Sequence, residues 1–390
     1  MDFDLSEEQI LLRQSVERMA ADHYRFEQRK FHGAEPEGWS RAMWRRYAEL
    51  GLLGLPFVER YGGVGGGPVE TMIVMEAMGR ALALEPYLAT VVLAGGLIRH
   101  GGSAAQQAAL VPAIAGGTMI LAFAHAERQS RYDLADVATR ARPDGAGWVI
   151  DGEKSLVLHG DSADRLIVSA RVAGERRDRD GIALFLVDGA AKGVSRRPYA
   201  TQDGMRAAEI ALASVAVGRD SMLGAPGAAL PLIERVADEA IAALAAEAVG
   251  AMAALTDMTV DYLKTRRQFG VPIGNFQVLQ HRAADMLIAL EQARSMALYA
   301  TLTVAAPDAV ERRRAAAAAK VQVGRSGRFV GQQAIQLHGG IGMTMEYKAG
   351  HYLKRLTMID LMFGDADHHL RALARGGGLF AANDGENAGR

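Results

Sequence analysis

Residues 264–286 read KTRRQFGVPIGNFQVLQHRAADM and lie where one long helical pattern ends and the next begins. Apolar residues recur at helical spacing through residues 230–264 and again through residues 277–304. The glycines and the proline between these two runs predict a tight turn. An arginine beside such a turn can hold a phosphate through a charge-assisted hydrogen bond and the N–H groups of the next helix. Alone this signal is modest, because the helix dipole also favours an arginine there.

The helical pattern of this region contrasts with the middle of the chain. Apolar residues also recur at helical spacing up to about residue 117, but after Gly116 and Gly117 short apolar runs bounded by glycine and aspartate predict β-strands. We therefore predict an α+β fold with a N-terminal helical domain at residues 1–117, a middle β domain at 118–225, a C-terminal helical domain at 226–377 and a flexible tail at 378–390.

Composition and charge exclude several classes of protein. The chain has 390 residues, 49% of them hydrophobic, which suits a soluble protein with more than one core. Its formal net charge of −1 argues against nucleic-acid binding, and the absence of cysteine excludes disulfides and thiolate chemistry. The acidic, amphipathic start does not resemble a secretory signal, and no uninterrupted apolar run reaches about 20 residues. We therefore expect a cytoplasmic protein without a membrane span.

Two tempting features have simpler interpretations. The glycine run GGVGGG at residues 62–67 follows a helical pattern rather than a strand, so it does not meet the context of a dinucleotide-binding fold and predicts a turn. His351, His368 and His369 have no carboxylate or histidine partner at a convincing ligand spacing. We predict no metal site.

A second glycine-rich motif follows about sixty residues after the first. Residues 336–355 read QLHGGIGMTMEYKAGHYLKR, where the glycines let a backbone approach a ligand closely and Gln336 offers a hydrogen bond. The order and spacing of RxxFG, a glutamine seven residues later, and QxHGGxGxTxE resemble the acyl-CoA dehydrogenases. The resemblance runs from LSEEQ at residues 5–9 through GWVIDGEKSLVLHG at residues 147–160 to the last predicted helix.

This resemblance implies a fold, a cofactor and a reaction. Members of the family have a middle β-barrel or sandwich domain and a C-terminal four-helix bundle, hold FAD at a subunit interface, and usually form tetramers. In fatty acid metabolism they remove the α proton of an acyl-CoA with a carboxylate while the β hydrogen leaves as hydride to the flavin. An electron-transferring flavoprotein then accepts the electrons. The reaction requires a desolvated carboxylate near the thioester.

The resemblance also assigns cofactor and substrate residues. The predicted contacts to the ADP half of FAD are Arg266, Gln268, Phe269, Gln277, Gln336, Gly339 and Gly340, and those to the flavin ring are Phe123, His125 and Ala126. Glu127 matches the glutamate of the family's Thr-Glu pair. The middle domain also departs from the family: Arg131 and Tyr132 replace a Gly-Ser pair, and residues 156–158 (LVL) replace Trp-Ile-Thr. We expect Tyr132 to contact the substrate.

The family's usual catalytic base is absent. Its glutamate, in a Tyr-Glu-Gly-Thr motif, aligns with Phe363 in MFGD, or with Gly364 if one residue is inserted. A second register known among relatives, 26 residues before the motif arginine, holds Ala240. Glu239 lies one residue from that register, and Glu247 lies two helical turns along nearly the same face. Glu247 is the preferred candidate because its neighbours are apolar, which would desolvate it. An ion pair with an arginine or lysine from another helix is an equally good interpretation.

Asp365 and Asp367 are third-ranked candidates for the base, because aspartates beside a glycine more often form turns. A closer resemblance, to the small subunits of pimeloyl-CoA dehydrogenases, implies a dicarboxylyl-CoA substrate and a homologous large subunit that supplies the catalytic glutamate. The expected function is thus FAD-dependent α,β-dehydrogenation of an acyl-CoA, by a homo-oligomer or a heterotetramer. The alternatives are a catalytically silent partner subunit and a flavin oxidase or monooxygenase on the same fold.

Overall fold

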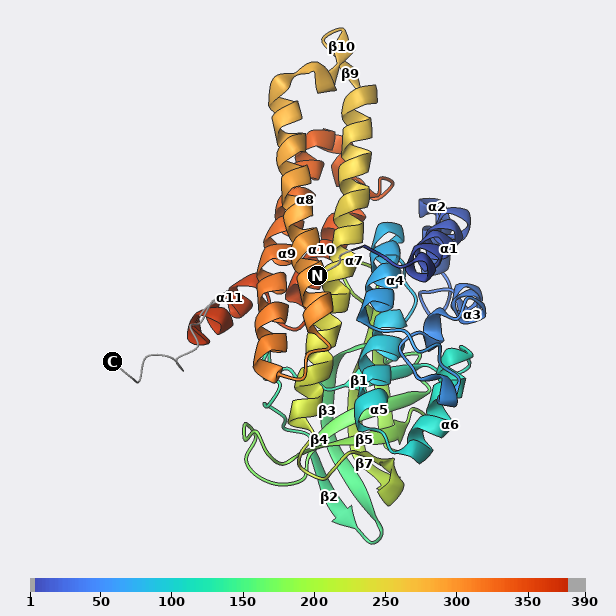
Figure 1. The fold of residues 1–390 in the computed structure, drawn as a ribbon. Coiled ribbons are helices and arrows are strands. Elements are labelled where there is room, and N and C mark those ends of the chain that lie inside the picture. The colour runs from blue at the N-terminus through green and yellow to red at the C-terminus, as the bar shows by residue number, and fades with distance from the viewer. Residues whose placement is uncertain (1–3, 378–390) are drawn as a thin grey trace, which may run out of the picture. The chain divides into compact units, whose positions relative to one another are not determined.

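The computed structural model describes residues 4–377, so the predicted tail at residues 378–390 lies outside the described part. Helices occupy the beginning and the end of the chain and a sheet occupies the middle (Figure 1), which confirms the predicted fold class. The chain divides between Ala243 and Leu244 into two compact units. The first unit contains the N-terminal helices, the sheet and the first part of the long helix at residues 230–265, and the second contains the rest of that helix and the helices that follow it.

The N-terminal helices begin with a well-capped segment. The Ser6 hydroxyl accepts from the Gln9 N–H at 3.2 Å, and the Gln9 side chain accepts from the Ser6 N–H at 3.0 Å, which is a capping box. Five further α-helices and a buried π-helix, η3, follow. Their bounds are α1 Glu7–His23, α2 Phe26–Gly33, α3 Arg41–Glu49, α4 Pro68–Ala81, η3 Leu88–Ala94, α5 Gly95–Gly101 and α6 Ala104–Ala115.

The middle of the chain forms one eight-stranded sheet. Its main path runs β6-β7-β3-β2-β4-β5-β8, and β1 pairs with β4 in parallel, with Phe123 opposite Ile167. The strands are β1 Leu121–Ala124, β2 Arg140–Asp144, β3 Gly147–Leu158, β4 Arg165–Arg171, β5 Ile182–Asp188, β6 Val194–Ala200, β7 Arg206–Gly218 and β8 Met222–Leu223. The side chain of Thr90 in η3 exchanges hydrogen bonds with the backbone of Leu121 at 2.9 and 3.2 Å. This links the π-helix to β1.

The C-terminal helices are long and antiparallel. Figure 1 shows α8 and α9 side by side, and α9 also packs against α10 and α11. A small hairpin of β9 and β10 joins α7 to α8. The elements are α7 Leu230–Thr265, β9 Arg267–Gln268, β10 Val271–Pro272, α8 Gln277–Thr303, α9 Ala309–His338, η6 Gly339–Met343, α10 Ala349–Leu361 and α11 Ala366–Arg375. The sequence did not predict α11 as a separate helix.

Helix α7 is long and apolar enough to cross a membrane by length and composition alone. However, 83% of its most apolar window is buried inside the protein. Its apolar surface therefore packs within the protein, as in the central helix of many folded domains.

Candidate functional site

The two sequence motifs meet at one end of the helical unit. The ring of Tyr262, one turn before the end of α7, lies 4.6 Å from the ring of His338 at the end of α9. The Arg282 guanidinium of α8 donates to the Gln333 side chain of α9 at 3.3 Å. The predicted ADP-binding residues, all exposed, lie in the segments next to these contacts: Arg266, Gln268, Phe269, Gln277, Gln336, Gly339 and Gly340.

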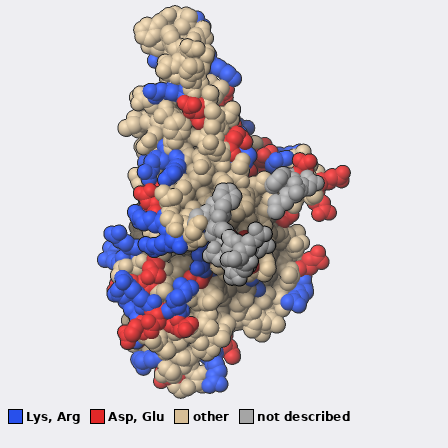
Figure 2. All heavy atoms as spheres, turned by 60° about the vertical axis from the view of Figure 1, so that its left-hand side comes forward, with Lys and Arg blue, Asp and Glu red and all other residues tan. Residues whose placement is uncertain are grey.

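The hairpin between α7 and α8 carries the first of these segments. Phe269 and Gly270 both have positive φ angles, +53° and +81°, the combination of a two-residue hairpin turn of type I′. The Arg266 carbonyl accepts from the Ile273 N–H at 2.8 Å, which closes the turn. The Phe269 ring is 91% exposed. On the face that Figure 2 shows, this tip carries few charged side chains. Phe269 is thus an exposed apolar residue three positions after the predicted phosphate-binding arginine.

The glycine loop after α9 leaves space for a ligand. A Cβ atom added to Gly342 would lie 3.1 Å from the Cβ of His338, so internal packing favours glycine there. Apart from the adjoining backbone, no atom of residues 4–377 lies within 4 Å of a Cβ built on Gly340, and Gly340 has no positive φ angle. Neither backbone strain nor packing within the chain accounts for Gly340. An open backbone beside an exposed glutamine and arginine fits the approach of the phosphates of FAD.

Sequence reasoning missed the aromatic support of this loop. The centroid of the His338 ring lies 4.6 Å from that of Tyr262 and 5.0 Å from that of Tyr347. Its Nδ1–H donates to the Ala334 carbonyl at 2.8 Å, which fixes the tautomer. Burial lowers the pKa of His338 despite this hydrogen bond, so the ring is neutral at pH 7. The signal in the sequence was the pair of aromatic residues that flank the glycine loop, His338 before it and Tyr347 after it.

The predicted flavin-ring residues lie at the end of β1 in the first unit. The rings of Phe123 and His125 stack at 5.1 Å with 13° between their planes, and both are half-buried. The Ala126 carbonyl accepts from the Ser155 N–H of β3 at 2.8 Å. This hydrogen bond joins the residues that follow β1 to Ser155, which directly precedes the segment 156–158 that departs from the family pattern.

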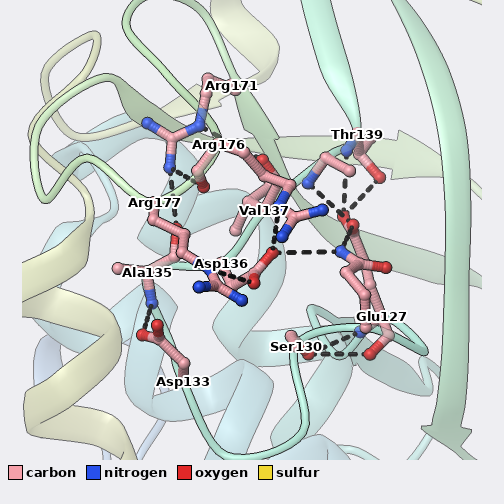
Figure 3. A network of polar contacts seen from close by, with 12 residues as sticks. Glu127, Ser130, Asp133, Ala135, Asp136, Val137, Thr139, Arg171, Arg176 and Arg177 are labelled. Atoms are coloured by element: carbon pink, nitrogen blue, oxygen red, sulfur yellow. Dashed lines mark hydrogen bonds and ion pairs between the residues drawn. The ribbon is translucent and has the colours of Figure 1, made fainter.

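Glu127 anchors this region through a fully satisfied carboxylate (Figure 3). One oxygen accepts from the Thr139 N–H, the Thr139 hydroxyl and the Lys154 ammonium at 3.1, 2.7 and 2.7 Å. The other accepts from the Ala138 N–H at 2.8 Å and the Gln129 side chain at 2.7 Å. Burial alone would raise the pKa of Glu127, but Lys154 and these hydrogen bonds lower it to about 2. Burial lowers the pKa of Lys154 to about 8, so both groups are charged at pH 7.

The loop after Glu127 carries Tyr132, the predicted substrate contact. The Ser130 N–H and hydroxyl both donate to the Glu127 carbonyl, at 3.0 and 2.8 Å, so the loop begins with a tight turn. Figure 3 shows Asp136 facing the arginines of the neighbouring loop, and its carboxylate pairs with Arg176 and Arg177 at 3.0 and 2.8 Å. Tyr132 itself is half-buried between these two fixed points.

The neutral state of His125 gives a prediction on acid stability. Burial, followed by the charge of Lys154, lowers the pKa of His125 to about 3, whereas the unfolded chain binds a proton from about pH 6.5 downward. The unfolded state therefore binds more protons between pH 6.5 and 3, and stability falls as the pH drops through this window. Relative to His125→Gln, the wild type should lose on the order of 2 kcal/mol more between pH 8 and pH 5. Urea unfolding of both proteins at the two pH values measures this; equal losses would contradict it.

Glu247, the preferred candidate for the base, is paired. Its two oxygens accept from Nε and Nη2 of Arg355 in α10 at 2.6 and 2.8 Å, and both side chains are buried. This is the ion pair that the sequence left as an equal alternative. A carboxylate held in a two-pronged pair is a poor proton acceptor, because protonation would leave the arginine charge buried without its partner. The geometry therefore favours a structural ion pair over a role of Glu247 as the catalytic base.

Glu239, the second candidate, is also engaged. Its carboxylate accepts from Arg99 Nη2 at 2.5 Å and forms a hydrogen bond with His100 Nε2 at 2.7 Å. Burial alone would raise the pKa of Glu239, but the hydrogen bond with His100 and the charges of Arg99 and Arg235 lower it. A lowered pKa weakens a carboxylate as a base at neutral pH.

The loop between α10 and α11 holds the remaining candidates. Phe363 occupies the family's glutamate position with a φ of +57°, and its carbonyl accepts from His369 Nε2 at 2.9 Å. Asp365 caps α11 by accepting from the His368 N–H at 2.7 Å, and Asp367 is exposed to solvent. A helix cap and a solvated carboxylate both lack the desolvation that the chemistry needs. Residues 4–377 also contain no group of three or more metal-ligand side chains.

Comparisons with known proteins match most of the chain. Three family models match it: acyl-CoA dehydrogenase, N-terminal domain, at residues 6–118; middle domain, at residues 122–215; and C-terminal domain, at residues 232–378. The chain is 30% identical to the probable acyl-CoA dehydrogenase YngJ of Bacillus subtilis, over 96% of this chain and 99% of that protein.

Two solved structures are similar along nearly their full length. The Tcur3481–Tcur3483 steroid ACAD is 30% identical with a TM-score of 0.85, over 95% of this chain and 97% of that one. The ChsE4–ChsE5 complex from Mycobacterium tuberculosis is 26% identical with a TM-score of 0.86, over 96% and 98% of the two chains.

Proposed function

The chain belongs to the acyl-CoA dehydrogenase family, and we propose that it works as one of two homologous subunits, of which the other carries the catalytic base. The family's reaction is the FAD-dependent α,β-dehydrogenation of an acyl-CoA, so the chain is an oxidoreductase that acts on CH–CH bonds with FAD as its cofactor. The proposal adds that the catalytic base and the binding residues described above belong to two different chains.

One observation carries this proposal: each candidate carboxylate of the chain is already engaged or solvated. Glu247 pairs with Arg355, Glu239 pairs with Arg99, and Phe363 stands at the family's usual position. FAD, when bound, accepts the β hydrogen of the thioester as hydride. Removal of the α proton still requires a free, desolvated carboxylate, and the proposed large subunit supplies it. The two-component names of the similar solved structures support such an arrangement.

The chain's own residues bind and orient the reactants in this proposal. Arg266, with the exposed side chains and glycines at its end of the helical unit, contacts the ADP half of FAD. Phe123, His125 and Ala126 contact the flavin ring, and Tyr132 contacts the substrate. The open backbone at Gly340 and the stacked rings of Phe123 and His125 support these assignments. An electron-transferring flavoprotein is the proposed electron acceptor, and the cytoplasm the proposed location.

A dicarboxylyl-CoA such as pimeloyl-CoA is the proposed substrate, supported by the resemblance of the motifs to pimeloyl-CoA dehydrogenase small subunits. Recognition of a second carboxylate by a cation should favour pimeloyl-CoA over heptanoyl-CoA, its monocarboxylyl counterpart of equal chain length. We expect at least about a tenfold difference in kcat/KM, which corresponds to 1.4 kcal/mol. Equal values for the two thioesters would contradict this substrate class.

Co-expression tests the two-subunit arrangement. The chain is produced alone and together with a homologous acyl-CoA dehydrogenase subunit from the same genome, and native mass spectrometry measures the assemblies. We expect a stable complex with both chains, and thioester-dependent electron transfer by the complex that exceeds that of this chain alone by at least about a hundredfold, the scale of one acid–base catalyst. A homo-oligomer with full activity would contradict the proposal and favour a base within this chain.

A further inference from the structure

At the end of β1, two stacked aromatic rings lie next to a buried cluster of polar side chains. Alternate residues of a strand face the same side, so Phe123 and His125 stack on one face. Three polar groups next to His125 are buried: the exposed fractions are 1% for Lys154, 6% for Glu127 and 0% for Ser169. These three polar groups have no access to water and must satisfy their hydrogen bonds among themselves and with their neighbours.

A count of hydrogen atoms in this buried group determines the direction of each bond. The ammonium of Lys154 has three hydrogens and three acceptors, which are Glu127 Oε1 at 2.7 Å, Ser169 Oγ at 3.0 Å and the His125 carbonyl at 3.2 Å. Because Ser169 Oγ accepts from Lys154, its own hydrogen needs a separate acceptor. Within residues 4–377 the acceptor in reach is His125 Nδ1, at 2.9 Å.

The opposite assignment leaves an unsatisfied group. If the His125 ring donated from Nδ1, Ser169 Oγ would accept two hydrogen bonds and its hydroxyl hydrogen would be buried without an acceptor. A buried donor without an acceptor is unfavourable, because it has lost its hydrogen bond to water and gained none in the protein. The ring therefore accepts at Nδ1, and since it is neutral, its one proton lies on Nε2. No side chain or carbonyl of the described residues forms a hydrogen bond with that Nε2.

We propose that Lys154 and Ser169 are positioning residues that hold His125 as the Nε2–H tautomer, so that it offers a fixed hydrogen-bond donor to an acceptor atom of the FAD ring. A neutral donor beside two half-buried aromatic rings suits a heteroaromatic ring with nitrogen and carbonyl acceptors. A donor oriented before binding needs no reorganisation when the ring arrives. The inference rests on the proposed function only for the identity of the acceptor.

Nitrogen NMR of the histidine rings tests this inference. The full chain is labelled with 15N-histidine and stripped of cofactor, and the resonance missing from His125→Gln identifies His125. We expect a protonated Nε2 and an unprotonated Nδ1 in the wild type. Ser169→Ala should give a mixture of tautomers, whereas Ser169→Thr, which keeps a hydroxyl, should preserve the wild-type form. A protonated Nδ1 in the wild type would overturn the inference without any variant being made.

Addition of FAD then tests the acceptor. The Nε2 resonance should shift on binding, and Ser169→Ala should weaken FAD binding by about 2–10-fold, the worth of one neutral hydrogen bond. Bound FAD that leaves the Nε2 resonance unmoved would overturn the assignment of the flavin as acceptor. Failure of FAD to bind at all would instead contradict the proposed cofactor contacts, and the tautomer measured without FAD would still decide the role of Lys154 and Ser169.

Discussion

Replacing Arg355 with methionine should destabilise the helical unit by about 3–5 kcal/mol. The substitution removes both hydrogen-bond donors from Glu247, whose carboxylate is 4% exposed. A buried carboxylate without its cation has neither water nor a countercharge to stabilise it. The free energy of unfolding, measured by urea denaturation at pH 7, reports this loss.

The double variant is the matched control. Glu247→Leu with Arg355→Met replaces both charges by apolar side chains of similar size, and such replacements are often neutral or stabilising. We expect the double variant to recover most of the stability that Arg355→Met loses. A loss below about 1 kcal/mol for Arg355→Met alone would show that the pair does not form. Glu247 would then return as a candidate for the base.

Gly340→Val should weaken FAD binding by at least about tenfold, which corresponds to 1.4 kcal/mol. A side chain at this position would fill the space that the glycine loop leaves open, because no atom of the described residues beyond the adjoining backbone lies within 4 Å of the added Cβ. For the same reason the free energy of unfolding of the FAD-free protein should change by no more than about 0.5 kcal/mol. Fluorescence titration with FAD measures the affinity.

Gly342→Ala, in the same loop, is the control variant for Gly340→Val. Its Cβ would lie 3.1 Å from His338 Cβ and 3.2 Å from the Ile335 carbonyl, so the substitution should destabilise the protein by about 1 kcal/mol. The two glycines are two residues apart, yet one is expected to act on cofactor binding and the other on stability. Unchanged FAD affinity in Gly340→Val would contradict the assignment of this loop to the cofactor.

The order of structural elements could be predicted from the sequence because it depends on local patterns. Helical spacing before Gly116 and after residue 230, and short apolar runs between them, follow from which faces each element must bury. Helix α11 was missed since it is only ten residues long and begins directly after the turn at Phe363 and Gly364. Its cap by Asp365 is a signal that could have been recognised.

The state of the candidate carboxylates could not be predicted, because it depends on distant partners. Glu247 and Arg355 are 108 residues apart, and Glu239 and Arg99 are 140 apart. An apolar sequence neighbourhood indicates burial of a carboxylate but not which cation reaches it. The glycine and glutamine motifs were more informative, since they combine several residues at fixed spacing on adjoining elements.

Anaerobic addition of an acyl-CoA to the purified chain tests the central claim most directly. The visible spectrum of the chain is recorded with its FAD, then after pimeloyl-CoA or a medium-chain acyl-CoA is added, and again after the homologous subunit is supplied. We predict that the flavin absorbance persists with the thioester alone and bleaches only with the second subunit. Complete bleaching by this chain on its own would contradict the account and show that one of its own carboxylates acts as the base.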